Sequence, residues 1–326
     1  MILLTRAEVA QLLDMSDCID AVERAFIEHA KGELPTAPGI LGSPVGGGGY
    51  HIKTAALGGE RGYFAAKINA NFPENYKTRG LPTVQGVIAL FDLMSGRPLA
   101  ILDSIEITIL RTAAASAAAA RRLALPEART VTIYGCGVQG RSHLRAMALV
   151  RPLSHAYAID LDNARAASFA KELSAELGIS ITPNEQLDSA IAASEICVTS
   201  TPSRQPILHA RMLHPGLFIA AVGADNPEKQ EIEPAALAKS KVVVDLVDQA
   251  ASIGDLHHAI DAGVMHPSDV HAELGQVLAG LRPGRTSADE TFIFDSTGTA
   301  LQDVAAAAVV YERAKGAGCG TLMELT

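Results

Sequence analysis

The sequence predicts an α/β protein: a Rossmann-type doubly wound sheet joined to a second, discontinuous α+β domain. Two observations carry this prediction. From about residue 130 to 295, short apolar β-rich runs alternate with helical patterns, and the first run leads into a glycine motif. Alternation of this kind produces a parallel sheet with helices on both faces. Before residue 104, four apolar segments follow one another with short turns, which indicates an antiparallel sheet.

The glycine motif is Gly135-x-Gly137-x-x-Gly140, and it follows the apolar run Val131–Tyr134. Gly135 permits a tight turn, Gly137 lets the backbone approach a diphosphate, and Gly140 allows close packing of helix on strand. The helix N-terminus adds free N–H groups and the positive end of a dipole. A second strand ends in Asp160, whose carboxylate suits the hydroxyls of an adenosine ribose. Together these features predict that the chain binds NAD.

NAD is favoured over NADP because the Asp160 carboxylate repels a 2′-phosphate and no Arg or Lys directly follows it. NAD exchanges hydride with a carbon that bears nitrogen or oxygen, so the protein must also hold the substrate carboxylate and move a proton. Lys53, Lys67 and Arg111 are candidate cations for the carboxylate, and Asp225, which follows an apolar strand, is a candidate proton-transfer group. The sequence contains no G-x-S-x-G, HExxH or Walker A motif that would indicate another chemistry.

Composition narrows the class of protein further. A chain of 326 residues holds one large or two medium domains, and its net charge of −9 supplies no basic surface for nucleic acid or an anionic membrane. The four cysteines lie far apart and form no metal-binding or disulfide pattern, which suits a reducing compartment. No signal peptide and no apolar run of the ~18 residues that span a bilayer are present, so a cytoplasmic location is expected.

The first part of the chain begins with helices. Thr5-x-x-Glu8 predicts a capping box at the start of a short helix, and Ser16 is a candidate N-cap for a second. Glycines and prolines predict a loop over residues 34–49 that covers or borders a site. A helix is expected from Arg111 to Leu125. The four strands are expected at residues 50–55, 63–68, 84–92 and 98–103.

The second part should contain six strands, six helices and a final helix over residues 299–315 that returns to the first domain. The expected strands lie near 131–135, 155–160, 195–200, 217–222, 241–245 and 291–294. The expected helices lie near 139–150, 163–177, 185–193, 233–239, 247–262 and 269–279. This gives a substrate-binding and dimerisation domain of residues 1–120 and 299–326, and an NAD-binding domain of residues 121–298.

Several motifs together resemble the ornithine cyclodeaminase/μ-crystallin superfamily, which includes amino-acid dehydrogenases and imine reductases. The resemblance covers nearly the whole chain, and the segments on either side of the glycine motif are more specific than that motif itself. They are Ala66-Lys-Ile-Asn69, Leu81-Pro-Thr83, Gly96-Arg-Pro-Leu-Ala100, Leu110-Arg-Thr-Ala-Ala114, Gly223-Ala-Asp225-x-Pro227-x-Lys229-x-Glu231 and Ser296-x-Gly298.

The resemblance implies a homodimer and a set of residue roles. Lys67 and Arg111 would bind the substrate carboxylate, with Thr297 also on the substrate side, and Asp225 with Lys67 would carry the catalytic proton transfers. The cofactor would contact residues on both sides of the glycine motif. These are Thr83, Arg111, Gly135, Gly137, Val138, Gln139, Asp160, Thr201, Ala221, Val222, Lys229 and Ser296.

One departure from the family bears on the substrate. Many members carry an arginine before the first strand that clamps the carboxylate, but residues 34–39 contain none. They also have Met-Pro-Ala where this chain has Ile52-Lys-Thr-Ala55. Lys53 therefore either replaces the arginine or binds a second acidic group, as in iminosuccinate or aspartate. An added cation disfavours ornithine, whose δ-ammonium needs carboxylates.

Three functions stay open on the sequence. The first is an NAD-dependent imine reductase or amino-acid dehydrogenase that interconverts an L-amino acid and its 2-imino acid. The second is an ornithine cyclodeaminase-type lyase with catalytic NAD and no net redox change. The third is a non-catalytic nucleotide- and ligand-binding protein. Retention of Lys67, Arg111 and Asp225 favours an enzyme over the third.

Overall fold

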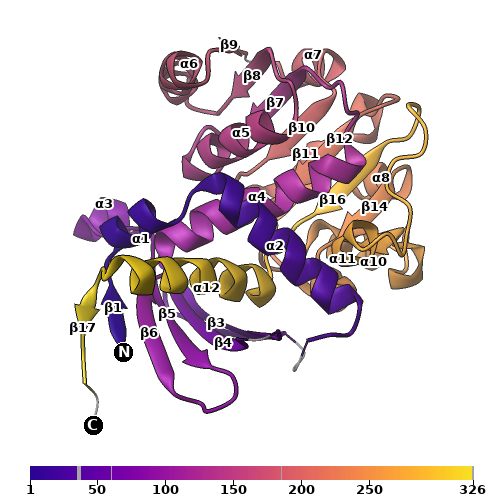
Figure 1. The fold of residues 1–326 in the computed structure, drawn as a ribbon. Helices are drawn as coiled ribbons and strands as arrows, with labels where there is room; N and C mark the ends of the chain where they lie inside the picture. Colours follow the sequence, from indigo (N-terminus) through magenta and orange to yellow (C-terminus); the bar gives the residue numbers. More distant parts are fainter. Residues whose placement is uncertain (35–37, 60, 185, 325–326) are drawn as a thin grey trace. The chain divides into compact units, whose positions relative to one another are not determined.

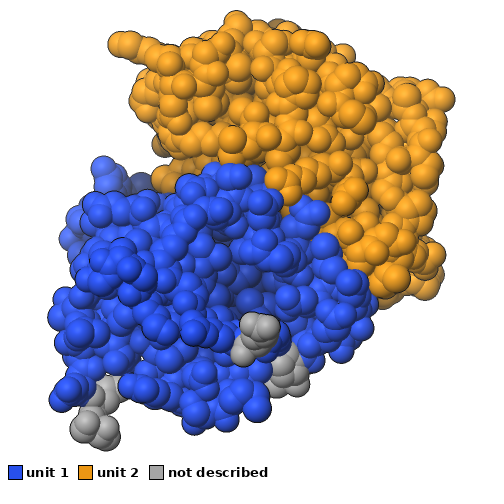
Figure 2. All heavy atoms as spheres, viewed as in Figure 1, with its two compact units in different colours: residues 1–111, 299–326 blue, residues 112–298 orange. Residues whose placement is uncertain are grey.

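The computed structural model describes residues 1–34, 38–59, 61–184 and 186–324. The chain forms two compact units (Figure 2). Unit 1 comprises Met1–Arg111 and Thr299–Thr326, and unit 2 comprises Thr112–Gly298. The division falls within helix α4 (Ile105–Leu123), whereas the sequence predicts a domain boundary at residue 120 and a helix that begins only at Arg111. The helix begins earlier because it continues directly from the turn after strand β6.

Unit 1 contains a seven-stranded sheet. The central part is the predicted antiparallel meander, and β1 extends it by pairing in parallel with β6. In sheet order the strands are β17 (Thr321–Leu322), β1 (Ile2–Leu4), β6 (Pro98–Asp103), β5 (Val84–Asp92), β4 (Tyr63–Asn71), β3 (Gly48–Leu57) and β2 (Gly39–Val45).

Strand β2 corrects the predicted loop over residues 34–49. Gly39 to Val45 pair antiparallel with β3 throughout, so ladder hydrogen bonds override the local glycine and proline signals. Residues 35–37 of that predicted loop lie outside the described residues.

Besides the start of α4, the described part of unit 1 contains the helices α1 (Arg6–Leu12), α2 (Met15–Ala30), α3 (Asn75–Arg79) and α12 (Ala300–Ala317). The predicted capping box of Thr5 and Glu8 opens α1. Asp14, not Ser16, caps α2, because the Asp14 carboxylate accepts the Asp17 N–H one turn in. Helices α2 and α12 lie side by side, and α12 packs on β3 and β4 (Figure 1). The final predicted helix therefore returns to the first unit, as expected.

The two faces of this sheet have different environments. Side chains alternate between the faces, and cross-strand partners share a face. Lys53, Lys67 and Ile88 are directly opposite one another on β3, β4 and β5 and are buried on the face beneath α12. On the opposite face Ile68 and Val87 are paired and exposed. The sheet thus places two lysines inside and an apolar row outside.

Unit 2 contains an eight-stranded parallel sheet with the predicted doubly wound topology. The strand order β8, β7, β10, β12 around the glycine motif places the switch point between β7 and β10. In sheet order the strands are β15 (Ala272–Glu273), β14 (Lys241–Val244), β16 (Phe292–Asp295), β12 (Phe218–Ala221), β10 (Ile196–Thr199), β7 (Thr130–Tyr134), β8 (His155–Ile159) and β9 (Ser180–Pro183).

A separate pair of short strands, β11 (Arg204–Leu208) and β13 (Gln230–Ile232), was not predicted. The helices of unit 2 are α5 (Val138–Val150), α6 (Asn163–Leu177), α7 (Leu187–Ala192), α8 (Pro234–Ala238), α9 (Val247–Ile253), α10 (Asp255–Asp261) and α11 (Leu274–Leu278), with 3-10 turns η1 (Ala210–Met212) and η2 (Pro267–Asp269).

The single helix predicted over residues 247–262 is two helices, α9 and α10, which meet at Gly254. A side chain at Gly254 would place its Cβ 2.5 Å from the Asp295 carboxylate, so the chain passes too close to that carboxylate for any other residue. Among the described residues, no helix has the length and apolar character that crossing a bilayer requires.

Candidate functional site

A cavity of about 650 Å³ opens in unit 2 beside the glycine motif. Its walls come from the turn after β7, the end of β8 and the segment after β10, so it lies at the switch point where doubly wound sheets bind ligands. The lining includes Tyr134, Gly135, Gly137, Asp160, Leu161, Arg165, Ser200, Thr201 and Pro202.

The glycine motif fits a nucleotide diphosphate. Gly135 has a positive φ of 102°, and a Cβ at Gly140 would lie 2.0 Å from the Gly135 carbonyl oxygen, so both positions need glycine. A Cβ at Gly137 would enter open space in the lining of the cavity, where it would occupy room available to a ligand. Gly137 also precedes the first turn of the thirteen-residue helix α5, whose free N–H groups suit an anion.

The next residues of α5 have contrasting environments. Val138 is exposed at the helix start, and the Oε1 atom of Gln139 is buried with no hydrogen-bond partner among the described residues. A buried acceptor of this kind is costly unless a ligand or water satisfies it. The pair therefore adds one exposed apolar contact and one unsatisfied polar atom to the motif.

Asp160, the candidate ribose ligand, lines the cavity and is held by hydrogen bonds. Its carboxylate accepts the Cys136 N–H at 2.9 Å and the Asp162 N–H at 3.0 Å. Arg165 also approaches it, with Nη1 3.4 Å from Oδ1. The sequence prediction missed Arg165 because it considered only the position after Asp160, whereas the first turn of α6 brings a residue five positions later beside the carboxylate.

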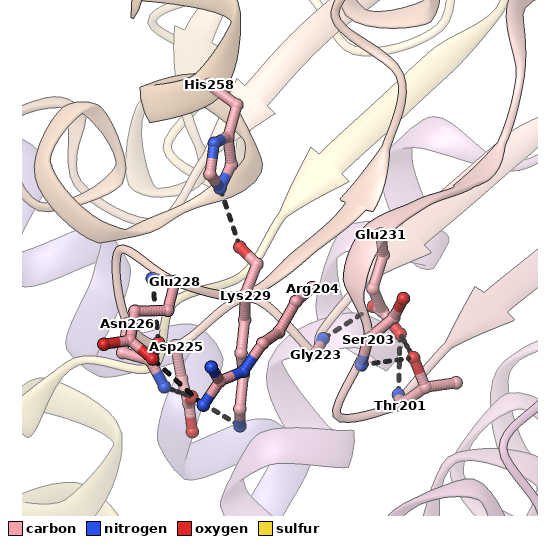
Figure 3. A network of polar contacts seen from close by, with 10 residues as sticks. All are labelled: Thr201, Ser203, Arg204, Gly223, Asp225, Asn226, Glu228, Lys229, Glu231 and His258. Atoms are coloured by element: carbon pink, nitrogen blue, oxygen red, sulfur yellow. Dashed lines mark hydrogen bonds and ion pairs between the residues drawn. The ribbon is translucent and has the colours of Figure 1, made fainter.

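The segments that follow β10 and β12 meet at one buried carboxylate. Thr201 donates its backbone N–H and its hydroxyl to Glu231 Oε1, and the Gly223 N–H binds Oε2 (Figure 3). Ala221 is buried at the end of β12, and the Val222 N–H donates to the Thr199 carbonyl. Thr201, Ala221 and Val222 therefore belong to one hydrogen-bonded edge of the sheet.

Asp225 lies two residues after Gly223 and pairs with Lys229. The Lys229 Nζ is 2.7 Å from Asp225 Oδ1, and Asn226 Nδ2 donates to the same oxygen at 3.2 Å. The Lys229 carbonyl lies 2.9 Å from His258 Nε2, which ties this segment to α10 (Figure 3). The Asp225 side chain is 42% exposed, so the carboxylate is accessible while its position is held.

Ser296 and Thr297 follow β16 and differ in their contacts. The Ser296 hydroxyl is buried with no partner among the described residues, which leaves it available to a ligand. The Thr297 hydroxyl donates to Asp245 Oδ1 at 2.7 Å and accepts from Gln249 at 2.7 Å. The structure thus places Thr297 in a buried polar network of unit 2.

Unit 1 contains a second candidate site, a cluster of buried charged side chains on the sheet face covered by α12. Lys67 Nζ lies 2.6 Å from Asp303 Oδ2, and Arg111 Nε lies 3.0 Å from Asp303 Oδ1. Gln302 accepts a hydrogen bond from Arg111. Lys53, only 8% exposed, lies directly opposite Lys67 on the neighbouring strand. We call Lys53, Lys67, Arg111 and Asp303 the cation cluster.

The cluster shifts the ionisation of its members. Burial lowers the pKa of Lys67 to about 7; Asp303 opposes this shift, and Arg111 and Lys53 add to it. Burial alone would raise the pKa of Asp303, but Lys67, Arg111 and Lys53 hold it below its usual value. Lys67 is therefore poised to gain or lose a proton near neutral pH, while Asp303 stays ionised.

Asp303 and Gln302 were missed by sequence reasoning. The available signal was a polar pair inside an otherwise apolar, alanine-rich helix, where a buried charge requires partners. Thr83 lies in the segment before β5, half-buried, and its carbonyl accepts the Phe72 N–H at 2.8 Å. His51 lies two positions before Lys53 on β3 and so shares its face of the sheet.

The Ornithine cyclodeaminase/mu-crystallin family model matches residues 1–318. The chain belongs to this family. The predicted family and the predicted Rossmann fold are thereby confirmed, and so is the extent of the resemblance along the chain.

Three proteins that are similar to this chain match nearly all of its length. A putative dehydrogenase of Rhizobium meliloti is 40% identical over 99% of this chain and 98% of its own. The structure of an archaeal alanine dehydrogenase dimer with bound NAD matches 100% of this chain and 99% of its own with a TM-score of 0.95 and 36% identity. The iminosuccinate reductase of Paracoccus denitrificans, in complex with NAD⁺, matches 100% of this chain and 99% of its own with a TM-score of 0.90 and 32% identity.

These names agree with the predicted class, an NAD-dependent amino-acid dehydrogenase or imine reductase of the ornithine cyclodeaminase/mu-crystallin family.

Within the part of the chain that the structure describes, no group of His, Cys, Asp or Glu side chains is arranged to hold a metal ion.

Proposed function

We propose that this chain is an NAD(H)-dependent oxidoreductase that interconverts an L-amino acid and its 2-imino acid. The observation that carries the proposal is the cation cluster, in which the buried side chains of Lys67 and Arg111 pair with a single protein carboxylate, that of Asp303. Burying that much positive charge is costly unless an anion neutralises it. A substrate carboxylate supplies that anion.

The cavity of unit 2 supports NAD as the cofactor. Gly137 and the N-terminus of α5 would hold the diphosphate, and Asp160 would hold the ribose. Bound there, NAD(H) supplies the hydride acceptor or donor at its nicotinamide ring. Ser296, Val222 and Lys229 would flank that ring.

Lys67 and Arg111 would orient the substrate through its carboxylate. Both side chains are already fixed by Asp303, so little side-chain freedom remains to be lost when substrate binds. The lowered pKa of Lys67 also fits proton exchange with the substrate nitrogen. Asp225, held by Lys229 and Asn226, would take or return the other proton as the amine becomes an imine or is restored.

The position of Lys53, directly opposite Lys67 on the neighbouring strand, is our basis for proposing an acidic substrate such as iminosuccinate or aspartate. Lys53 and Lys67 are like charges directly opposite each other, an arrangement that is destabilising by itself. One carboxylate of the substrate would pair with Lys67 and Arg111, and the second with Lys53. A similar iminosuccinate reductase makes this substrate class the first to test.

A cyclodeaminase-type lyase is the second candidate, since such enzymes belong to the same family. It would need carboxylates around the second amine of a diamino acid. The carboxylate of the cation cluster, Asp303, is already paired with Lys67 and Arg111, which disfavours this reading.

The experiment is a substrate screen followed at 340 nm. Iminosuccinate, formed from oxaloacetate and ammonia, would be tested with NADH beside pyruvate, 2-oxobutyrate and Δ1-pyrroline-2-carboxylate. L-Aspartate, L-alanine, L-proline and L-ornithine would be tested with NAD. Fastest turnover of the dicarboxylic imine supports the full proposal. Turnover of L-ornithine to proline without a net change at 340 nm would support the lyase instead.

We also propose that the chain forms a homodimer through the outer face of the unit 1 sheet. Leu41, Ile68 and Val87 are 61%, 44% and 43% exposed on that face. With Ile52 they form a continuous cross-strand row over β2, β3, β4 and β5. Contiguous exposed apolar side chains are typical of an interface.

A further inference from the structure

Glu231 has no role in the chemistry proposed above, yet its carboxylate accepts four hydrogen bonds at the carboxyl edge of the unit 2 sheet. It lies on the short strand β13 and is fully buried. Oε1 accepts the Thr201 N–H at 2.6 Å and its hydroxyl at 2.7 Å. Oε2 accepts the Thr199 hydroxyl at 2.7 Å and the Gly223 N–H at 2.8 Å.

The four donors require an acceptor at both oxygen atoms. One backbone N–H points at each oxygen, and a backbone N–H can only donate. A glutamine would satisfy one of these N–H groups with its oxygen and oppose the other with its own NH₂, whichever way the amide is turned. The site is therefore built for a carboxylate and not for a neutral side chain of the same shape.

The backbone of Glu231 is fixed as firmly as its side chain. Asp255 Oδ1 accepts the N–H groups of Glu231 and Ile232 at 2.8 and 2.9 Å. Burial raises the pKa of Glu231. Among the described residues, the partners of its carboxylate are hydroxyl and backbone N–H groups, so no ion pair offsets the cost of burying the negative charge. A buried carboxylate held in this way is an expensive means of joining two loops.

The two loops that Glu231 joins have different tasks. Thr201 lines the cavity, next to Ser200 and Pro202. Gly223 begins the segment that carries Asp225 and Lys229, and a Cβ at Gly223 would lie 2.4 Å from the Glu231 carboxylate carbon (Figure 3). One side chain thus fixes the cavity wall on one side and the start of the Asp225 segment on the other.

We propose that Glu231 is a positioning residue that links the cofactor cavity to Asp225, so that both are correctly placed in the same molecule. This inference rests on the proposed function, in which the cavity holds NAD and Asp225 transfers a proton. Glu231 itself is not among the residues that line the cavity.

The test compares Glu231→Gln with Glu195→Gln. Glu195 accepts the N–H groups of Arg129 and Thr130 at the opposite, amino edge of the same sheet, so its replacement makes the same chemical change away from the cavity. For each variant, NADH affinity is measured by fluorescence titration. The isotope effect on kcat is measured with NADH deuterated at the transferred position, and folding is checked by thermal unfolding.

Glu231→Gln is expected to weaken NADH binding about tenfold or more, the effect of one unsatisfied buried donor. It should also lower kcat and increase the isotope effect, because hydride transfer becomes more rate-limiting when the reacting groups are misplaced. Glu195→Gln should retain NADH affinity and the isotope effect of the unmodified enzyme. If the role of Glu231 were purely structural, Glu231→Gln would reduce Tm and the amount of active enzyme but would leave NADH affinity and the isotope effect unchanged.

The inference would be overturned if folded Glu231→Gln has the same NADH affinity and the same isotope effect as the unmodified enzyme. If Glu231→Gln does not fold, Thr199→Val is measured instead, because it removes one side-chain donor to Glu231 that lies outside the cavity. NADH affinity about threefold weaker than that of the unmodified enzyme would support the inference, and unchanged affinity would overturn it. Failure of the unmodified enzyme to bind NADH would instead refute the proposed function.

Discussion

Asp160 and Arg165, which meet in the lining of the unit 2 cavity, should have opposite effects on cofactor selection. The carboxylate would repel a 2′-phosphate, whereas the guanidinium beside it would bind one. We expect the unmodified enzyme to prefer NADH, and Asp160→Ser to weaken NADH and improve NADPH use by about tenfold. Steady-state kinetics with both cofactors measure this.

Arg165 provides the control for that experiment. The double variant Asp160→Ser/Arg165→Ser should lose the gain with NADPH, because no cation remains to bind the phosphate. Equal or better use of NADPH by the unmodified enzyme would contradict the assignment of Asp160.

Asp225 is expected to act through its proton. Asp225→Asn keeps the size of the side chain but removes the acid–base group, so turnover should fall by ~10²–10⁴. NADH and substrate affinity should change only modestly. Single-turnover measurements at saturating substrate separate the two effects. Retained turnover would transfer this role to Lys67, whose pKa of about 7 suits it.

Lys53 should determine affinity for the second carboxylate of a dicarboxylic substrate. Lys53→Met should raise KM for iminosuccinate about tenfold or more, which is about 1.4 kcal/mol, without changing NADH affinity. Lys77→Met, at a 75%-exposed surface lysine, is the matched control and should leave KM unchanged. An unaltered KM in Lys53→Met would remove the case for an acidic substrate.

The pKa of Lys67 predicts a pH dependence. If a substrate carboxylate binds protonated Lys67, as proposed, kcat/KM should fall as pH rises through about 7, the pKa to which burial lowers this lysine. Lys53 lowers that pKa, so in Lys53→Met the fall should move to higher pH. A pH profile of kcat/KM for both enzymes tests this. A fall at the same pH in both would show that another group titrates.

The same shift affects stability in a defined window. The pKa of about 7 in the folded chain lies below the ordinary lysine value of 10.5, so between these pH values the unfolded chain binds more protons at Lys67 than the folded chain does. The contribution of Lys67 to the free energy of unfolding therefore rises with pH across that window. Below pH 7 the full cost of burying the protonated lysine is present.

At the scale of elements, periodicity and capping predicted most helices and strands. The capping box of α1 and the extent of α6, which the sequence places at 163–177, agree with the structure. Long apolar patterns carry their own signal, whereas β2 and β13 exist only because a neighbouring strand supplies the hydrogen bonds. Such pairing depends on contacts distant in sequence, so local patterns could not predict it.

The residues of the candidate site also divide into those that a local sequence pattern predicts and those that depend on contacts distant in sequence. Gly135, Gly137 and Asp160 were predictable because one βαβ unit brings them together over a short stretch of chain. Asp303 lies 236 positions after Lys67 (303 minus 67), and no local pattern relates the two. Arg165 was within reach of sequence reasoning, since helical geometry after Asp162 would have placed it beside Asp160.

The exposed row of the unit 1 sheet makes the dimer testable as a property of one element. A charge at Ile68 would be solvated in a monomer but buried in the proposed interface, so Ile68→Glu should convert the dimer to a monomer in light scattering. Met94→Glu, at an 88%-exposed position outside the row, should remain dimeric. A monomeric unmodified chain, or a dimer that tolerates Ile68→Glu, would place the interface elsewhere.

At the scale of the whole molecule, the order of the chain has a consequence for its synthesis. Unit 2 is one continuous segment, Thr112–Gly298, whereas unit 1 is completed only by α12. As the chain leaves the ribosome, Lys53, Lys67 and Arg111 emerge long before Asp303. All residues that line the unit 2 cavity have been translated before α12 begins. The newly made chain therefore has every residue of that cavity before it has the carboxylate that pairs with Lys67 and Arg111.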